Sequence, residues 1–285
     1  MQQIEQITVW GTGLLGTSLG LALQANGYAG RLIGLGRRQA TLDAAKAIGA
    51  FHATSTESAE VVPNSDLVVV AVPLSGFEAV FTQLAAHQRP EATVTDVGST
   101  KQRVLESAHR LLPYPERFVG AHPMAGSEQS GPEAASASLF QGRPCVLTPG
   151  DDAAADATAT VRELWQAVGM NLIELDPTTH DAHAATVSHV PHLVAGLLIA
   201  LAEARGGWDL ASTGFRDATR LAAGDPTVWR DIITTNQQPV GEALRQFRGQ
   251  LDDLITLIDR GEGQAIEHWL EARKAARDAW HRNRF

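Results

Sequence analysis

A glycine-rich turn near the amino terminus limits the folds that this chain can adopt. The apolar segment 4–10 predicts a strand, and Gly11, Gly13 and Gly16 follow it in GxGxxG spacing at the start of a predicted helix. In a dinucleotide-binding turn the first glycine permits a tight bend, the second lets the backbone approach a pyrophosphate, and the third allows close helix packing. The free N–H groups of the helix start can hold the phosphates. The alternative is a tight turn that binds no ligand.

Strands and helices alternate through the first part of the chain, which indicates a parallel sheet with right-handed crossovers. Further strands are predicted at Arg31–Leu35, Leu67–Val72, Ala92–Thr95, Pro144–Thr148 and Met170–Leu175, and helices at Gln39–Ile48, Thr100–Leu112 and Ala153–Val168. Beyond Pro177 only helical patterns follow, at Thr178–Arg205, Pro226–Asn236, Pro239–Asp259 and Gly263–Arg282. We expect an α/β, Rossmann-type doubly wound domain over residues 1–176 and an all-helical domain over residues 177–285.

Charge and cysteine content exclude several classes of protein. The net charge of −9 argues against a nucleic-acid partner, because phosphate backbones need clustered lysine and arginine. One local arginine can still hold a small anionic ligand. The single cysteine, Cys145, permits no intrachain disulfide and fits a reducing compartment. We find neither a basic-then-apolar leader at 1–10 nor an apolar run long enough for a membrane span, so we expect a cytoplasmic protein without a membrane partner.

The end of the second predicted strand bears on cofactor choice. NAD enzymes usually carry an acid about 20 residues beyond the glycines, where it binds the ribose 2′-hydroxyl. Here Arg37 and Arg38 occupy that place, and no acid occurs before Asp43. Paired guanidinium groups can hold a 2′-phosphate, whereas the alternative is two solvated arginines. We predict NADP as cofactor, with NAD possible; the candidate binding residues are Gly11, Thr12, Gly13, Leu14, Leu15, Gly16, Arg37, Arg38, Val72 and Pro73.

A second glycine-rich segment, 120–131, follows the apolar pair Phe118 and Val119 and contains His122. A loop after a buried strand lies where open parallel sheets place their ligands, and a histidine there can exchange a proton near neutral pH. The alternative is a surface turn in which His122 only packs. Ser99 follows another predicted strand, where it can cap the next helix or orient an imidazole. Lys101 indicates either a nearby anion or a solvated side chain.

Five segments together resemble the prephenate/arogenate dehydrogenase (TyrA) family of tyrosine biosynthesis. They are GTGLLGTSLG, DVGSTK, GAHPMAGSEQSG, SHVPH and FRDATRLAAGDPTVWRDI, and they span nearly the whole chain in order. The resemblance implies a dinucleotide-binding domain followed by an all-helical dimerisation domain. It also implies a reaction in which prephenate or arogenate gives a hydride to the nicotinamide, loses carbon dioxide and becomes aromatic.

The resemblance also assigns roles to single residues. The family's catalytic histidine falls on His122, the serine that bonds it on Ser99, and the arginine that holds the substrate carboxylate on Arg220. Neutral His122 would take the hydroxyl proton, and Arg220 would hold a carboxylate through two hydrogen bonds. The other candidate substrate-binding residues are His189, His192, Glu128, Ser127 and Trp229. Glu128 would favour the ammonium group of arogenate and His192 the keto acid, so the preferred substrate stays open.

Other interpretations of these residues remain. The spacing of His180, His183, His189 and His192 also suits metal ligands. Without a nearby carboxylate–cysteine set, and in a family that needs no metal, we expect no metal site. Arg220 could instead pair with Asp217 or Asp225, and Trp229 could only pack. Rival functions are another NADP oxidoreductase, of the beta-hydroxyacid dehydrogenase or imine reductase type, and a non-catalytic NADP-binding redox sensor.

The helical part carries an apolar stripe that suits a partner. The stripe comprises Leu244, Phe247, Leu251, Leu254, Ile255 and Ile258 at helical spacing. In a domain of this size such a stripe can pack internally or against a second copy of the chain. We expect a homodimer through the helical domain, because two-fold dimers are the commonest homo-oligomers. Pro191, which has no N–H, should start or kink a helix near His189 and His192.

Overall fold

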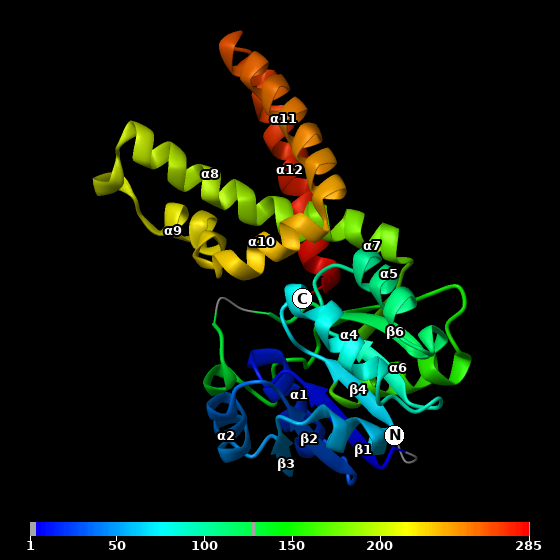
Figure 1. Cartoon of the computed structure of the whole chain (residues 1–285). Coiled ribbons are helices and arrows are strands. Elements are labelled where there is room, and N and C mark those ends of the chain that lie inside the picture. The colour runs from blue at the N-terminus through cyan, green and yellow to red at the C-terminus, as the bar shows by residue number, and fades with distance from the viewer. Residues whose placement is uncertain (1–3, 127–128, 285) are drawn as a thin grey trace. The chain divides into compact units, whose positions relative to one another are not determined.

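The computed structural model describes residues 4–126 and 129–284, and the chain divides into two compact units, Met1–Gln237 and Gln238–Phe285. Among the described residues the strands of the first unit form one sheet of eight (Figure 1). The strands are β1 (Gln6–Trp10), β2 (Arg31–Leu35), β3 (Ala53–Ser55), β4 (Leu67–Val70), β5 (Thr93–Asp96), β6 (Phe118–Pro123), β7 (Pro144–Pro149) and β8 (Asn171–Glu174). Their order in the sheet is β3-β2-β1-β4-β5-β6-β7-β8.

The sheet is mostly parallel, as expected, but not wholly so. Strands β1 to β6 run parallel, whereas β7 pairs antiparallel with β6 and β8 runs parallel to β7. A parallel neighbour needs a long crossover, usually a helix, while an antiparallel one needs only a return of the chain. The connection from β6 to β7 contains only a short 3-10 turn, Pro132–Ala134, among its described residues, so the chain returns antiparallel. The expected doubly wound α/β sheet is therefore confirmed as a mostly parallel one, with the addition that β7 runs antiparallel to β6.

Most of the predicted helices are present, with shifted ends. The helices are α1 (Leu14–Ala25), α2 (Gln39–Ala47), α3 (Ser58–Val61), α4 (Phe77–Ala85), α5 (Gln102–Leu111), α6 (Ala155–Ala167), α7 (Pro177–Ala184), α8 (Val190–Arg205), α9 (Thr213–Thr219), α10 (Pro226–Thr235), α11 (Gln237–Asp259) and α12 (Gly263–Arg284). The single helix expected over 178–205 is interrupted by a π-helical turn, Ala185–His189, and Pro191 lies in the first turn of α8. Helix α4 was missed, although Phe77, Val80, Phe81 and Leu84 carry helical spacing.

Helices cover both faces of the sheet because each strand sends alternate side chains to opposite sides. In β4 Val69 packs in a buried cluster with side chains of α1 and α6, while Val68 and Val70 pack in a second cluster with α4 and α5. Each fully buried branched side chain contributes about 1.5–3 kcal/mol. This two-sided burial explains why the strand reads as an unbroken apolar run.

A buried ion pair links three segments: the end of β5, the start of α5 and strand β6. Lys101 is fully buried and its ammonium pairs with Asp96, at the end of β5. The ammonium also donates to the carbonyl oxygen of Ala121 in β6 (2.8 Å), and Asp96 accepts from the N–H groups of Ala121 (3.0 Å) and Gly98 (2.7 Å). Of the two alternatives for Lys101, the nearby anion is confirmed, since it is the carboxylate of Asp96, and the solvated side chain is wrong because Lys101 is buried.

The stretch Pro177–Arg205 is long enough and apolar enough to cross a membrane. Its most apolar 18-residue window has a mean hydropathy of 1.6, and 28% of that window is buried. This corrects the expectation that the chain has no apolar run long enough for a membrane span. The same stretch buries the polar residues His180, Asp181 and His189. The pattern is therefore weak support for a membrane span.

The second unit consists of a helical hairpin. Helix α11 and helix α12 are joined by a short turn in which Gly261 adopts φ +64°, a value that favours glycine. Four residues of the predicted stripe on α11 are exposed to between 38% and 57%; they are Phe247, Leu251, Ile255 and Ile258. The first unit leaves apolar side chains of α8 exposed as well, among them Leu197 and Leu201.

Replacing Lys101 with methionine is expected to lower the free energy of unfolding by about 3–5 kcal/mol, because Asp96 then stays buried without its counter-charge. Urea denaturation followed by circular dichroism measures the loss. The matched control is Lys46→Met, which removes an exposed lysine from α2 and should leave stability nearly unchanged. A loss for Lys101→Met no larger than that of the control would show that the ion pair does not stabilise the fold.

Candidate active site

A cavity of about 790 Å³ lies at the carboxyl ends of β1, β2 and β4, where the strand order reverses. Open α/β sheets bind their ligands at this point. Of the predicted cofactor residues, those in the lining are Gly11, Thr12, Gly13, Arg37, Arg38, Val72 and Pro73. The predicted residues Leu14, Leu15 and Gly16 are not in the lining. They form the first turn of α1 behind it.

The three glycines of the turn have different surroundings. Gly11 has φ +115°, and a Cβ there would lie 2.3 Å from the carbonyl oxygen of Ala71. A Cβ on Gly16 would lie 1.9 Å from the carbonyl oxygen of Gly11, so only glycine lets the helix pack this closely against the turn. A Cβ on Gly13 would meet nothing within 4 Å, which leaves the backbone open toward the cavity. The residues present therefore fit a dinucleotide.

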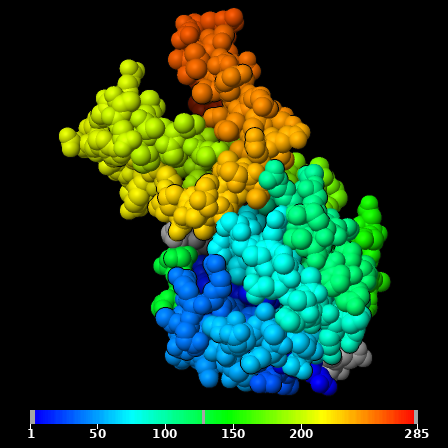
Figure 2. Space-filling view, in the orientation of Figure 1, coloured from blue at the N-terminus to red at the C-terminus, as the bar shows by residue number. Residues whose placement is uncertain are grey.

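Arg37 and Arg38 lie between β2 and α2, and both are exposed. Arg38 is the residue directly before α2, whose first turn holds no acidic side chain. Figure 2 shows the blue segment with α2 and the cyan segment with α4 on one face of the surface. Two cations at this rim of the cavity suit an anionic group, since each guanidinium can donate two parallel hydrogen bonds to phosphate.

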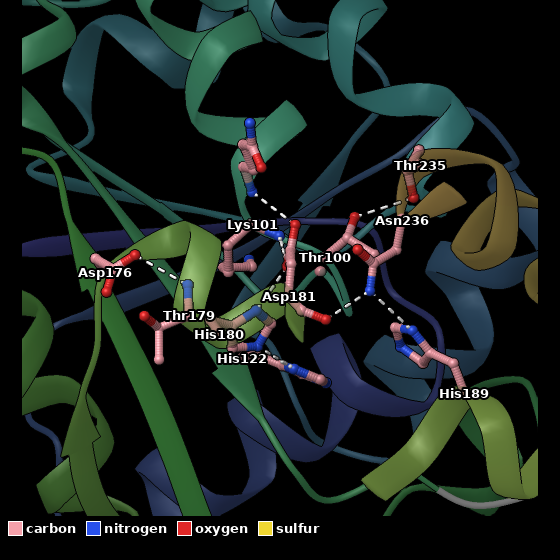
Figure 3. Close-up of polar contacts among 12 residues, drawn as sticks. Thr100, Lys101, His122, Asp176, Thr179, His180, Asp181, His189, Thr235 and Asn236 are labelled. Atoms are coloured by element: carbon pink, nitrogen blue, oxygen red, sulfur yellow. Dashed lines mark hydrogen bonds and ion pairs between the residues drawn. The ribbon is translucent and has the colours of Figure 1, made fainter. Parts of the chain in front are cut away.

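His122 lies inside strand β6, not in a loop as predicted, and its side chain is 7% exposed. Its Nδ1 is 2.9 Å from Nε2 of His180, and Nδ1 of His180 is 2.7 Å from Oδ1 of Asp181 (Figure 3). Helix α7 positions both partners and begins after Asp176, whose carboxylate accepts the N–H of Thr179 (2.9 Å). A chain of three side chains thus leads from α7 to the end of β6.

This chain fixes where the protons are. The carboxylate of Asp181 only accepts, so a neutral His180 ring has its proton on Nδ1 and offers Nε2 as acceptor. His122 must then donate from Nδ1, which leaves a lone pair on its Nε2. Burial, together with His180 and Lys101, holds the pKa of His122 well below its usual range. His122 is therefore a neutral imidazole, and within the described residues its Nε2 makes no hydrogen bond.

The side chain of Asp181 also caps the amino terminus of helix α5. Its carboxylate oxygens accept the backbone N–H groups of Lys101 (2.7 Å) and Gln102 (3.0 Å). The prediction that Ser99 caps this helix is wrong. The helix begins at Gln102, and the side chain of Asp181 from α7 caps it instead. Ser99 is half-buried, and within the described residues it makes no hydrogen bond to His122. Its predicted catalytic role stays a prediction.

A second group of predicted substrate residues lies at the end of the π-helical turn, on α8 and on α10. The ring of Trp229 stacks on His192, with centroids 3.5 Å apart at 13°, and meets His189 edge-on at 6.1 Å. His189 is 1% exposed and lies close enough to His122 to lower its pKa. Burial lowers the pKa of His192 as well, and lowers that of His189 to about 4.

Arg220 begins a 3-10 turn, Arg220–Ala223, and is exposed. His192 bonds the backbone of Leu221, the next residue, so the turn that carries Arg220 is tied to the histidine and tryptophan group. The predicted residues Ser127 and Glu128 lie outside the described residues. Within residues 4–126 and 129–284, no group of three histidine, cysteine, aspartate or glutamate side chains is arranged to hold a metal ion.

Sequence reasoning missed the role of His180 and Asp181, and also Asn236, which bonds His189 through its amide. His180 was considered only as a metal ligand, although the adjacent acid was a usable signal. A histidine with a neighbouring carboxylate is a common way to fix a ring tautomer. His183, the other member of that predicted pair, is exposed.

Two family models match the chain in succession. The model of the prephenate dehydrogenase nucleotide-binding domain matches residues 19–174, and that of the prephenate dehydrogenase dimerization domain matches residues 176–272. A curated prephenate dehydrogenase from Bacillus subtilis (strain 168) is 31% identical over 283 residues, which cover 97% of this chain and 76% of that protein. The similarity therefore extends over both the α/β and the helical parts.

Solved structures agree with these matches. The prephenate dehydrogenase from A. aeolicus, solved with hydroxyphenyl propionate and NAD+, has a TM-score of 0.90 at 30% identity, covering 96% of this chain and 97% of that one. The arogenate dehydrogenase from Synechocystis has a TM-score of 0.83 at 31% identity, covering 96% of this chain and 99% of that one. This chain belongs to the prephenate/arogenate dehydrogenase family.

Proposed function

We propose that this chain oxidises and decarboxylates a cyclohexadienol, prephenate or arogenate, in tyrosine biosynthesis, with His122 as the base. The observation that carries the proposal is the chain Asp181–His180–His122, which leaves a lone pair on Nε2 of a buried, neutral histidine. A general base must be unprotonated at the working pH and within reach of the proton it removes. The lowered pKa of His122 meets the first condition.

The reaction needs one proton acceptor from the protein. A nicotinamide dinucleotide held by the glycine turn supplies the hydride acceptor. Nε2 of His122 would take the proton of the substrate hydroxyl as the carbinol C–H bond loses hydride. The bond to the ring carboxylate would then break with release of carbon dioxide, its electron pair aromatises the ring to a phenolate, and the phenolate takes the proton back. His180 accepts the hydrogen on Nδ1 of His122 and Asp181 accepts that of His180, so the two residues orient the ring and keep its Nε2 lone pair available.

The substrate is anionic, and we propose Arg220 as the residue that holds its carboxylate. Its guanidinium is exposed on a turn bonded to His192, and bidentate contacts would fix the substrate for transfer. His189, His192 and Trp229 form the neighbouring wall, while Ser127 and Glu128 stay predicted contacts. Whether prephenate or arogenate reacts faster is decided by assay with each substrate.

We also propose a preference for NADP over NAD. Support comes from the exposed pair Arg37 and Arg38 at the rim of the cofactor cavity, and from the lack of an acid in the first turn of α2. A carboxylate there would repel a 2′-phosphate, and a guanidinium attracts it. The A. aeolicus relative was solved with NAD+, so the preference rests on this chain's own residues.

A dimerisation domain is present, and we propose that it forms a homodimer of a cytoplasmic enzyme. The exposed stripe on α11 supports this, because apolar side chains repeated along one helix face are expected to be covered in solution. We further propose that the dinucleotide-binding domain ends at residue 176 and the helical domain begins at 177.

Replacing His122 with alanine is expected to lower kcat by about 10²–10⁴-fold, because the proton then has no acceptor in the protein. Binding of NADP should be unchanged. The measurement is the appearance of reduced nicotinamide with prephenate and then with arogenate. The matched control is His183→Ala, an exposed histidine of α7, which should keep the original kcat. Full turnover by His122→Ala would contradict the assigned base.

Replacing both Arg37 and Arg38 with alanine is expected to raise KM for NADP by about tenfold or more, because charge-assisted hydrogen bonds to the 2′-phosphate are lost. KM for NAD should change little. The control is Arg31→Ala, which removes an exposed arginine from the start of β2, the strand that precedes Arg37 and Arg38. Equal or better use of NAD by the unaltered protein would rule out the proposed preference.

Replacing Ile255 with glutamate is expected to shift the protein from dimer to monomer, because a charge is then buried in the apolar contact. Light scattering at micromolar concentration measures the mass. Thr256→Glu adds the same charge on the opposite side of α11 and should leave the dimer intact. A monomeric unaltered protein, or an unaffected dimer in Ile255→Glu, would argue against this interface.

A further inference from the structure

Asn236 lies at the end of α10, is 1% exposed, and joins two parts of the site. Its Nδ2 is 2.8 Å from the carbonyl oxygen of Asp181 and 3.1 Å from Nδ1 of His189 (Figure 3). A carbonyl oxygen only accepts hydrogen bonds, so it fixes the orientation of the amide with its nitrogen at this point. The second hydrogen of the same NH₂ group therefore points to His189.

This contact decides which nitrogen of His189 carries the proton. Nδ1 accepts from Asn236, so a neutral ring must carry its hydrogen on Nε2. Burial, with His180 and His192, lowers the pKa of His189 to about 4 against the opposing effect of Asp181. The ring is then neutral wherever the pH is above that value. His189 thus presents one N–H group, at Nε2, with no second proton.

That N–H group has no partner. Nε2 of His189 is buried, and within the described residues nothing accepts a hydrogen bond from it. The ionisable groups around the ring are His122 of β6, His180 and Asp181 of α7, and His192 of α8. Asp181 is already bonded to His180, Lys101 and Gln102. A buried donor without an acceptor is costly, which points to a ligand atom as its partner.

We propose that Asn236 is a positioning residue that holds His189 as a neutral hydrogen-bond donor to an oxygen of the bound substrate. Asn236 itself does not touch the substrate. The proposal rests on the function proposed above, because the oxygen belongs to prephenate or arogenate. It gives the two buried histidines opposite tasks: Nε2 of His122 accepts a proton, whereas Nε2–H of His189 donates a hydrogen bond.

The first test needs no substrate and no variant of Asn236. Histidine labelled with ¹⁵N reports the tautomer of each ring in the ligand-free protein, and the signal of His189 is assigned by its loss in His189→Gln. We expect an unprotonated Nδ1 and a protonated Nε2 near neutral pH. A proton on Nδ1, or a doubly protonated ring, would overturn the proposal. This result is independent of whether prephenate is turned over.

The second test is Asn236→Asp, which replaces the donor beside Nδ1 with an acceptor. His189 should then move its proton to Nδ1, so KM for prephenate at about pH 8 should rise tenfold or more. The new carboxylate also raises the pKa of His189, so a second proton at lower pH should restore the donor and reduce KM again. In the unaltered protein His189 should cause no such change between about pH 6 and 8.

Controls separate positioning from general damage. Asn64→Asp makes the same substitution at an exposed residue whose amide bonds only a backbone carbonyl, and it should keep the original KM. In a His189→Gln background, Asn236→Asp should no longer produce the pH-dependent KM, because no tautomer remains to be set. An unchanged KM in a folded Asn236→Asp protein would overturn the proposal. If that variant does not fold, the ¹⁵N result decides alone.

Discussion

The site depends on the hydrogen bonds of one residue, Asp181. Its carboxylate accepts from the first N–H groups of α5 and from His180, and its backbone carbonyl accepts from Asn236. The side chain therefore sets the proton on His122 through His180. The carbonyl sets the proton on His189 through Asn236. A single residue of α7 thus gives two buried histidines opposite tautomers, and it can do so only while the helix start, the strand end and α10 keep their places.

The Asp96–Lys101 pair provides the second fixed point. It bonds both the N–H and the carbonyl of Ala121, the residue directly before His122, and so holds this part of β6 in register with β5. Buried ion pairs often add little net stability compared with apolar packing, while removing one partner is strongly destabilising. The pair is therefore better understood as fixing one arrangement of β5, α5 and β6. Its positive charge also helps to keep His122 neutral.

The sequence predicted what local patterns determine. The alternation of strands and helices, the glycine turn and the two arginines depend on neighbours a few residues apart, and the cavity lining contains most of the predicted cofactor residues. The contact of His122 with His180 joins residues 58 positions apart, and the cap of α5 by Asp181 joins residues 80 positions apart; neither periodicity nor spacing reveals them. The same limit explains the error at Ser99. Ser99 was expected to cap the helix that follows it, whereas the actual capping group, Asp181, comes from a tertiary contact. The full burial of Lys101 beside Asp96 likewise depends on packing that the sequence does not show.

Helix α10 connects the proposed cofactor cavity to the proposed substrate-binding residues. Asp225 caps its start and lines the cavity, and Asp231 in its middle accepts the N–H of Ser75 (3.3 Å), in the turn after β4. At its end Thr235 meets Thr100 (3.0 Å), and Asn236 follows directly. Because one rigid helix bears contacts to both halves of the site, a displacement of the cofactor turn would also move Trp229 and the partner of His189. Hydride transfer needs such alignment, since misplacing reacting groups by about 1 Å can cost a hundredfold in rate.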